Sequence, residues 1–289
     1  MKKPSVAIIG AGKVGSALGV LLQQKGYDIC AVASRTKESA AKLAKILNCP
    51  ALTSEEAACR AELIFITTPD RNIADTASAI ASMGCLHTGQ VVAHTSGAHP
   101  ASKLKGVREA GALAISVHPL QSVADMEVAI KNLPGSYFAL EGDEAAMPLA
   151  HQLVDDLGGK WFTVSAADKT IYHAAACVAS NYLVSLMHFA TGLYTKFGLS
   201  STEAFQALYP LVQGTIANIA QTGPAEALTG PISRGDLLTV ADHMQTLQKE
   251  DPQLNKLYTI LGQYTVQVAL EKNSITTEQG ATLLELLKA

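Results

Sequence analysis

The stretch "VAIIGAGKVG", residues 6–15, decides the fold class. Its apolar, partly β-branched start is followed at once by a G-x-G-x-x-G pattern, which opens an apolar helical pattern. Strand, glycine loop and helix in this order are the context in which such a pattern binds a dinucleotide. Gly10 permits the tight turn, Gly12 lets the backbone approach a pyrophosphate, and Gly15 allows close helix–strand packing. The N-terminus of the helix then offers N–H groups to the phosphates.

Strand and helix patterns go on alternating through the first half of the chain. Strand-like runs occupy residues 28–34, 63–68, 91–95 and 112–118, and further runs at 136–140 and 160–164 extend the series. Largely apolar strands separated by helices predict a mainly parallel sheet covered on both faces. Only helical patterns follow Val164. The sequence therefore predicts an α/β fold, with a Rossmann-type domain over residues 1–164 and an all-helical domain over residues 165–289.

Charge and cysteine content exclude several classes of function. The net charge is −3 and no basic run is interleaved with aromatic residues, which argues against nucleic acid as a partner. The five cysteines show no CxxC spacing. We therefore expect a reduced, cytoplasmic chain that binds no zinc or other metal.

Residues 170–195 carry no side chain of fixed charge and are long enough to span a bilayer. His173, Asn181 and His188 would each be costly in lipid, and no other segment of the chain looks membranous. A helix that is apolar on most sides is typical of a protein core or a subunit interface. We expect a soluble protein with no membrane partner.

The end of the second strand indicates which dinucleotide binds. NAD enzymes commonly carry an acidic residue there, whereas this chain has "SRTK", beginning with Ser34 and Arg35. A guanidinium and hydroxyl groups suit the 2′-phosphate of NADP(H), although Arg35 could also be a solvated residue at a helix start. We predict NADP(H) as the cofactor. Its expected binding residues are those of the glycine loop (Gly10, Gly12, Lys13, Val14 and Gly15), Ser34, Arg35, and Thr68 and Pro69 of the "TTPD" segment.

The next two strand ends carry candidate substrate ligands. In an open parallel sheet, ligands bind beyond the carboxyl ends of the strands. The fourth strand runs into "HTSG" with Ser96, and the fifth ends in "VHPLQS" with His118. Hydroxyl and imidazole groups converging there suit a carboxylate or carbonyl oxygen of a small molecule. Ordinary turn chemistry at Ser96 and a turn-stiffening role for His118 are the alternatives.

The segment "DKTIYHAAACVASNY", residues 168–182, opens the first long helix. At about 100° per residue, Lys169, His173, Cys177, Ser180 and Asn181 fall on one arc. Burial lowers the pKa of a lysine and makes it a competent proton donor near neutral pH. We name Lys169, His173 and Asn181 as candidate catalytic residues. A lysine that reaches solvent and hydrogen-bonded core residues remain the alternatives.

A shaped loop, "TGPISRGD", carries Arg234 and Asp236 in the helical half. Arg234 could bind a substrate carboxylate through two parallel N–H donors. The alternative is an Arg–Asp pair that only orders the loop. Both residues are candidate substrate ligands.

Taken together, the motifs resemble those of a bacterial oxidoreductase family with a Rossmann-like N-terminal domain and a helical C-terminal domain of long-unknown function. The motifs are "GAGKVG", "ASR", "TTPD", "HTSG", "VHPLQS", "DKTIYHAAACVASNY" and "TGPISRGD" followed by a histidine. The resemblance covers almost the whole chain and extends to the 6-phosphogluconate dehydrogenase-like superfamily. That superfamily includes β-hydroxyacid dehydrogenases, ketopantoate reductases and pyrroline-5-carboxylate reductases.

This resemblance implies roles for residues of the first long helix. In hydroxyacid-type members a lysine opens that helix as proton donor and an asparagine follows one turn on. Lys169 matches the lysine by position, but His173 stands one turn on and an asparagine comes only at Asn181. The resemblance therefore leaves open whether Lys169, His173 or both move the proton. It also implies a homodimer formed through the helical domain.

The leading hypothesis is an NADPH-dependent reductase of a small 2-oxo acid, with ketopantoate as the best single substrate. One alternative is an imine or pyrroline carboxylate reductase, or an enzyme that exchanges hydride between NADP and a deazaflavin. Another is a non-catalytic regulatory protein that binds NADPH. A substrate panel scored by NADPH oxidation separates these hypotheses.

Overall fold

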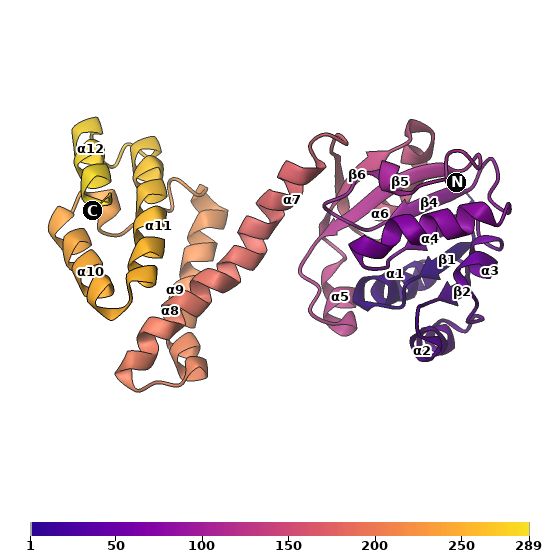
Figure 1. The fold of residues 1–289 in the computed structure, drawn as a ribbon, viewed down its shortest axis with the longest axis horizontal. Coiled ribbons are helices and arrows are strands. Elements are labelled where there is room, and N and C mark those ends of the chain that lie inside the picture. The colour runs from indigo at the N-terminus through magenta and orange to yellow at the C-terminus, as the bar shows by residue number, and fades with distance from the viewer. Residues whose placement is uncertain (1, 289) are drawn as a thin grey trace. The chain divides into compact units, whose positions relative to one another are not determined.

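A computed structural model describes residues 2–288 and shows two compact units, one ending at Tyr182 and the other beginning at Leu183 (Figure 1). The first unit contains the sheet, and the second contains only helices. The last strand ends at Thr163, yet the first unit continues through the next helix. That helix belongs with the sheet because Lys169 and Tyr172 at its start bond to one strand and to the turn that follows the neighbouring strand.

The sheet unit alternates strands and helices as expected. Its strands are β1 (Val6–Ile9), β2 (Ile29–Ala33), β3 (Leu63–Ile66), β4 (Val91–His94), β5 (Leu113–Leu120), β6 (Tyr137–Gly142) and β7 (Lys160–Thr163). Its helices are α1 (Lys13–Gln24), α2 (Lys37–Leu47), α3 (Ser54–Ala58), α4 (Asp70–Ser82), α5 (Met126–Asn132), α6 (Met147–Asp156) and α7 (Lys169–Cys177), with short turns η1 (Ala101–Lys103) and η2 (Glu144–Ala146). The predicted α/β fold is confirmed.

The strands lie in the order β2-β1-β3-β4-β5-β6-β7. All pairs are parallel except β5 with β6, so β6 and β7 extend the sheet but run opposite to the rest. Ile9 of β1 pairs with Ile66 of β3. In the same row across the sheet, Ile66 pairs with His94 of β4, and His94 pairs with Ser116 of β5. The residues that follow β1, β3 and β4 therefore meet at one edge, beside the second half of β5.

Both faces of the sheet are buried at its central strands, as β1 illustrates. Val6 and Ile8 belong to a core cluster that includes residues of α1, whereas Ala7 and Ile9 belong to a cluster that includes residues of α4. Side chains alternate between the faces of a strand, so a strand covered on both sides must be apolar throughout. This explains the uninterrupted apolar run before the glycine loop.

The helical unit consists of α8 (Leu183–Tyr194), η4 (Thr195–Phe197), α9 (Ser201–Thr222), η5 (Ile232–Arg234), α10 (Leu237–Glu250), α11 (Pro252–Glu271) and α12 (Thr277–Leu286). Its core includes Val240 of α10, Val266 of α11 and Leu283 of α12. Side chains spaced one or two turns apart on each helix supply this cluster, which is the pattern of amphipathic helices.

A π-helical segment, η3 (Val178–Tyr182), joins α7 to α8. Bonds from residue i to i+5 widen each turn, so the step of 100° per residue does not hold there. Ser180 and Asn181 lie in this segment, and the predicted arc of polar residues therefore extends only from Lys169 to Cys177. Within the described residues, the helical run Lys169–Phe197 is the one long and apolar enough to cross a membrane. Length and composition alone are weak evidence for that.

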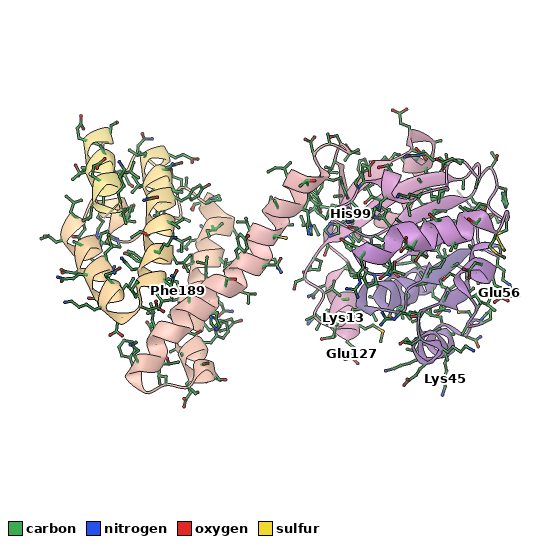
Figure 2. The ribbon with its side chains drawn as sticks, viewed as in Figure 1. Lys13, Lys45, Glu56, His99, Glu127 and Phe189 are labelled. Atoms are coloured by element: carbon green, nitrogen blue, oxygen red, sulfur yellow. A yellow bond between two sulfur atoms is a disulfide. The ribbon has the colours of Figure 1, made fainter. Side chains whose placement is uncertain are left out.

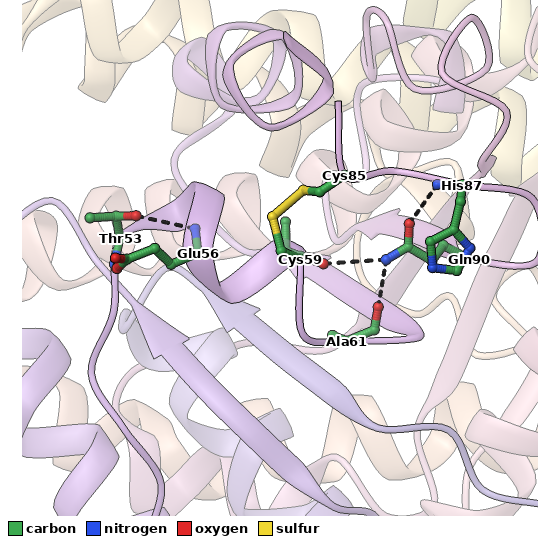
Figure 3. Close-up of a disulfide and its surroundings, with 8 residues drawn as sticks. Thr53, Glu56, Cys59, Ala61, Cys85, His87 and Gln90 are labelled. Carbon is green, nitrogen blue, oxygen red and sulfur yellow. Dashed lines mark hydrogen bonds between the residues drawn. A yellow bond between two sulfur atoms is a disulfide. The ribbon is translucent and has the colours of Figure 1, made fainter. Parts of the chain in front are cut away.

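A disulfide joins Cys59, after α3, to Cys85, after α4 (Figure 3). Beside it, Gln90 donates to the carbonyl oxygens of Ala58 and Ala61 at 3.3 and 2.8 Å. The expectation of a fully reduced chain is therefore wrong for these two cysteines, whereas the other three are free. The two cysteines are 26 positions apart and form no recognisable motif, and only the packing of α3 and α4 brings the thiols together.

Candidate functional site

The glycine loop after β1 has the geometry that its sequence predicts. Gly10 has a φ of +123°, and a Cβ there would lie 2.6 Å from the carbonyl carbon of Thr67. A Cβ at Gly15 would collide with the carbonyl oxygen of Gly10, whereas one at Gly12 would meet nothing within 4 Å. Gly10 and Gly15 are thus required by the packing of the loop. Gly12 instead leaves open space for a ligand.

That open space belongs to a cavity of about 490 Å³. Among the predicted cofactor residues, Gly10, Gly12, Ser34, Arg35, Thr68 and Pro69 line it. Lys13, the first residue of α1 (Figure 2), instead lines a neighbouring cavity of about 350 Å³ that shares Gly12. Val14 and Gly15 line neither cavity.

Sequence reasoning missed several polar residues of the larger cavity. They are Thr36, Ser39, Ser54, Arg71, Asn72 and Thr76. Arg71 and Asn72 directly follow the "TTPD" segment, which was expected to contact the cofactor. Their place in the sequence could therefore have identified them as further cofactor residues. The described lining residues include two arginines and no carboxylate. This arrangement suits an anionic ligand.

Lys169 at the start of α7 is buried, with 1% of its surface exposed. Its Nζ donates to the carbonyl oxygen of Ser96 at 3.1 Å and to Oγ of Ser116 at 2.8 Å. Burial lowers the pKa of Lys169 to about 8, against the opposing effect of the Glu141 and Asp70 carboxylates. Lys169 therefore places a positive charge between the ends of β4 and β5, and it does not line either cavity.

His118 on β5 pairs with Tyr172 on α7, a residue that sequence reasoning missed. Nδ1 of His118 lies 2.6 Å from the Tyr172 hydroxyl oxygen. Burial, followed by the Lys169 charge, lowers the pKa of His118 to about 4, so the imidazole is neutral near pH 7. Burial also raises the pKa of Tyr172 to about 12, so the phenol keeps its proton. The pair is an uncharged hydrogen-bonded unit.

Ser96 organises the turn after β4. Its hydroxyl donates to Oδ2 of Asp70 at 2.9 Å and accepts from the backbone N–H groups of Ala98 and His99, both at 3.3 Å. Its own N–H donates to Nδ1 of His94 at 3.1 Å. The hydroxyl of Ser96 already makes these hydrogen bonds, and the residue is only 5% exposed. Ser96 therefore has the arrangement of a turn-forming residue, which was the alternative to a substrate ligand.

His173 and Asn181 differ in their surroundings. His173 is half-buried beside His118, at 6.2 Å between ring centroids, and its Nε2 lies 3.6 Å from Sγ of Cys177. Asn181 is exposed in the π-helical segment. The sheet unit thus brings Lys169, His173, Ser96 and His118 together, with Asn181 further along the helix.

Arg234 and Asp236 lie in the helical unit, where Arg234 ends η5. Asp236 caps α10 by accepting from the N–H of Thr239 at 3.1 Å and from its hydroxyl at 2.7 Å. These bonds hold the pKa of Asp236 below its ordinary value, with a smaller contribution from the Arg234 charge. Asp236 is therefore occupied as a helix cap.

Two domain models match the chain. Residues 1–119 match a Rossmann-like domain, and residues 136–265 match DUF2520, a domain of unknown function. The two matches follow one another along the chain, and each covers less than half of it. The DUF2520 match begins at β6, so it includes the last two strands and α7 with Lys169, Tyr172 and His173.

Solved structures share this arrangement. The chain is similar to protein TM1727 from Thermotoga maritima, with 27% identity and a TM-score of 0.75 over 93% of this chain and 99% of that one. It is similar to BF3122 from Bacteroides fragilis, assigned as an NADP oxidoreductase, with 23% identity and a TM-score of 0.73 over 90% and 96%.

The chain is also similar to a reductive aminase from Aspergillus terreus solved with NADPH, with 16% identity and a TM-score of 0.62 over 99% and 93%. BF3122 and the reductive aminase are each less than 25% identical to this chain, so their similarity establishes the shared fold alone. The search of curated proteins found no match.

Proposed function

We propose that this protein is an NADP(H)-dependent oxidoreductase. The observation that carries the proposal is the cavity of about 490 Å³ above the glycine loop, which Arg35 and Arg71 line without a carboxylate. Backbone N–H groups at the start of α1 suit a pyrophosphate, and a guanidinium after β2 suits a 2′-phosphate. The fold shared with BF3122 and with the NADPH-bound reductive aminase supports the same cofactor.

The substrate that we propose is a small 2-oxo acid, with ketopantoate as the best single candidate. The cofactor, when bound, supplies the hydride that reduces the carbonyl carbon. The neutral imidazole of His118 and the buried Lys169 charge lie beside the ends of β4 and β5, where they suit a carbonyl oxygen that becomes negative during reduction. For Lys169 and His173 we propose roles in stabilising the charge on that oxygen.

Reduction of a cyclic or open imine is the second candidate. Neighbours with the same fold include a pyrroline-5-carboxylate reductase from Coxiella burnetii and an imine reductase from a Pseudomonas species. An imine nitrogen could take the place of the carbonyl oxygen beside the same histidines. The buried lysine is the feature that favours a carbonyl substrate, because its charge stabilises an alkoxide.

A substrate panel tests both proposals. Purified protein is incubated with NADPH or NADH and with ketopantoate, other 2-oxo acids, pyrroline-5-carboxylate or an oxidised deazaflavin, and cofactor oxidation is followed at 340 nm. We expect turnover with NADPH and a 2-oxo acid. NADPH binding without turnover of any compound would instead support a regulatory binding protein. Absence of NADPH binding would reject the proposal itself.

We further propose that the region after residue 164 forms the interface of a soluble, cytoplasmic homodimer. Exposed apolar side chains occur on several helices of the helical unit, including Val184 (68% exposed), Leu211 (67%) and Tyr264 (70%). Apolar residues this exposed on several helices of one unit favour burial against another protein surface. A second copy supplies a surface of the same kind. Light scattering should give twice the mass of the 30.3 kDa chain, and Val184→Lys should shift it towards the monomer.

A further inference from the structure

The turn after β4 lacks a side chain at Gly97, and two imidazoles pack against it. A Cβ built there would lie 2.8 Å from Cε1 and Nε2 of His118 and 2.8 Å from Nδ1 of His173. The backbone of Gly97 is not in the left-handed region, so glycine is needed there because the two rings leave no room for a side chain. Because both nitrogens lie 2.8 Å from one point, they are at most twice that distance apart. One oxygen atom between them can therefore hydrogen-bond to both rings.

The hydrogen bonds of the two histidines point to the same place. Nδ1 of His173 is buried and has no hydrogen-bond partner, while its Nε2 faces the thiol of Cys177. Buried polar atoms are nearly always bonded, so an orphaned nitrogen indicates a missing ligand atom. On His118 the opposite nitrogen, Nδ1, is engaged by Tyr172 at 2.6 Å, which leaves Nε2 to face Gly97.

Building on the proposed reductase activity, we propose that the substrate's carbonyl oxygen binds beside Gly97, where Nε2 of His118 protonates it while Tyr172 returns a proton to Nδ1. His118 is then the catalytic proton donor, and Tyr172 is a positioning residue that acts through it. The nitrogen of His173 provides the second hydrogen bond to the oxygen. Tyr172 was not a candidate on sequence grounds.

The proton transfers balance in a single sequence. Hydride from the cofactor forms the new C–H bond, and the π electrons of the carbonyl become a lone pair on oxygen. The Nε2–H bond of His118 breaks as the O–H bond forms, and Nδ1 takes the phenolic proton of Tyr172. An alkoxide is a stronger base than a phenolate, so the transfer runs downhill. After the product leaves, Nε2 of His118 takes a proton from water while Nδ1 returns its proton to the phenolate, which restores the starting tautomer.

Lys169 supports this sequence without touching the substrate. Two of its three N–H donors are held by Ser96 and Ser116, and its Nζ lies 5.7 Å from the centre of the Tyr172 ring. A positive charge at this place stabilises the transient phenolate. It also keeps His118 neutral, because a second positive charge nearby is unfavourable.

The tautomer of His118 gives a test that needs no substrate. Long-range ¹H–¹⁵N spectra of the ¹⁵N-histidine-labelled protein at pH 7 should place the His118 proton on Nε2, with His118→Gln identifying the signals. In Tyr172→Phe the Nδ1 tautomer should gain population. A wild-type proton on Nδ1 would overturn the proposal. Because this readout is independent of turnover, it distinguishes failure of the relay from failure of the proposed substrate.

Kinetics with ketopantoate and NADPH test the catalytic part. Tyr172→Phe should lower kcat by about 100-fold with KM within about twofold, whereas Tyr182→Phe, an exposed tyrosine on the same helical run, should have no effect. Gly97→Ala should abolish turnover while NADPH still binds, because its methyl group would lie 2.8 Å from both imidazoles and displace them. Gly214→Ala, whose Cβ meets nothing within 4 Å, is the control. Full activity of either Tyr172→Phe or Gly97→Ala would refute the assignment.

Discussion

Acidification should destabilise the sheet unit through two histidines at the strand ends, His94 and His118. His94 is fully buried, with Nδ1 accepting the N–H of Ser96 and Nε2 donating to the carbonyl oxygen of Pro100, both at 3.1 Å. Burial lowers the pKa of each histidine to about 4. Protonating His94 would also put a second donor at Nδ1, facing the N–H of Ser96.

The sign and size of the effect follow from these values. In the unfolded chain each imidazole titrates near pH 6.5, so between about pH 6.5 and 4 the unfolded state binds protons that the folded state does not. The free energy of unfolding therefore falls as the pH is lowered through this window. The full loss is about 3 kcal/mol for a fully buried histidine, of which about 2 kcal/mol occurs between pH 7 and 5. His118 is partly exposed and contributes less.

Urea denaturation at pH 7 and pH 5 measures this contribution. His94→Gln keeps an amide that can donate to Pro100 but cannot titrate, so its stability should fall less between the two pH values, by about 2 kcal/mol. His87→Gln, at an exposed position before β4, should keep the wild-type dependence. The test compares the change in the free energy of unfolding between the two pH values, so a loss of stability that is equal at both does not affect it. An unchanged pH dependence in His94→Gln would refute the reasoning.

Three further predictions concern the disulfide, the cofactor and the buried lysine. The Cys59–Cys85 bond closes a loop of 26 residues, so reduction should lower the free energy of unfolding by about 3.5 kcal/mol on the chain-entropy model; five reactive thiols in the unreduced protein would contradict this. Arg35→Ala should weaken NADPH binding by about 10- to 100-fold and leave NADH binding unchanged, as titration calorimetry can measure; an equal loss for both cofactors would contradict a 2′-phosphate contact. Lys169→Ala should lower kcat by about 10²- to 10⁴-fold with NADPH affinity retained; unchanged turnover would reject its role.

The α/β fold could be predicted because its signals are local. The apolar runs at Val6–Ile9 and Leu63–Ile66 are buried along their whole length, and Gly15 is required by its close approach to Gly10 within the same loop. The arc of polar residues on α7 was predictable only up to Cys177, because the π-helical turn that follows changes the angular step.

What the sequence by itself determined is the class of the protein: a parallel sheet, a dinucleotide loop and a basic strand end. The tertiary structure alone decided which polar side chains have a partner. In the folded protein the hydroxyl of Ser96 donates to Asp70, Tyr172 is hydrogen-bonded to His118, and Nδ1 of His173 has no hydrogen-bond partner beside Gly97. These contacts join residues from different strands and helices, so no spacing along the chain encodes them. They arise because parallel strands end at one edge of a sheet and a helix starts beside that edge.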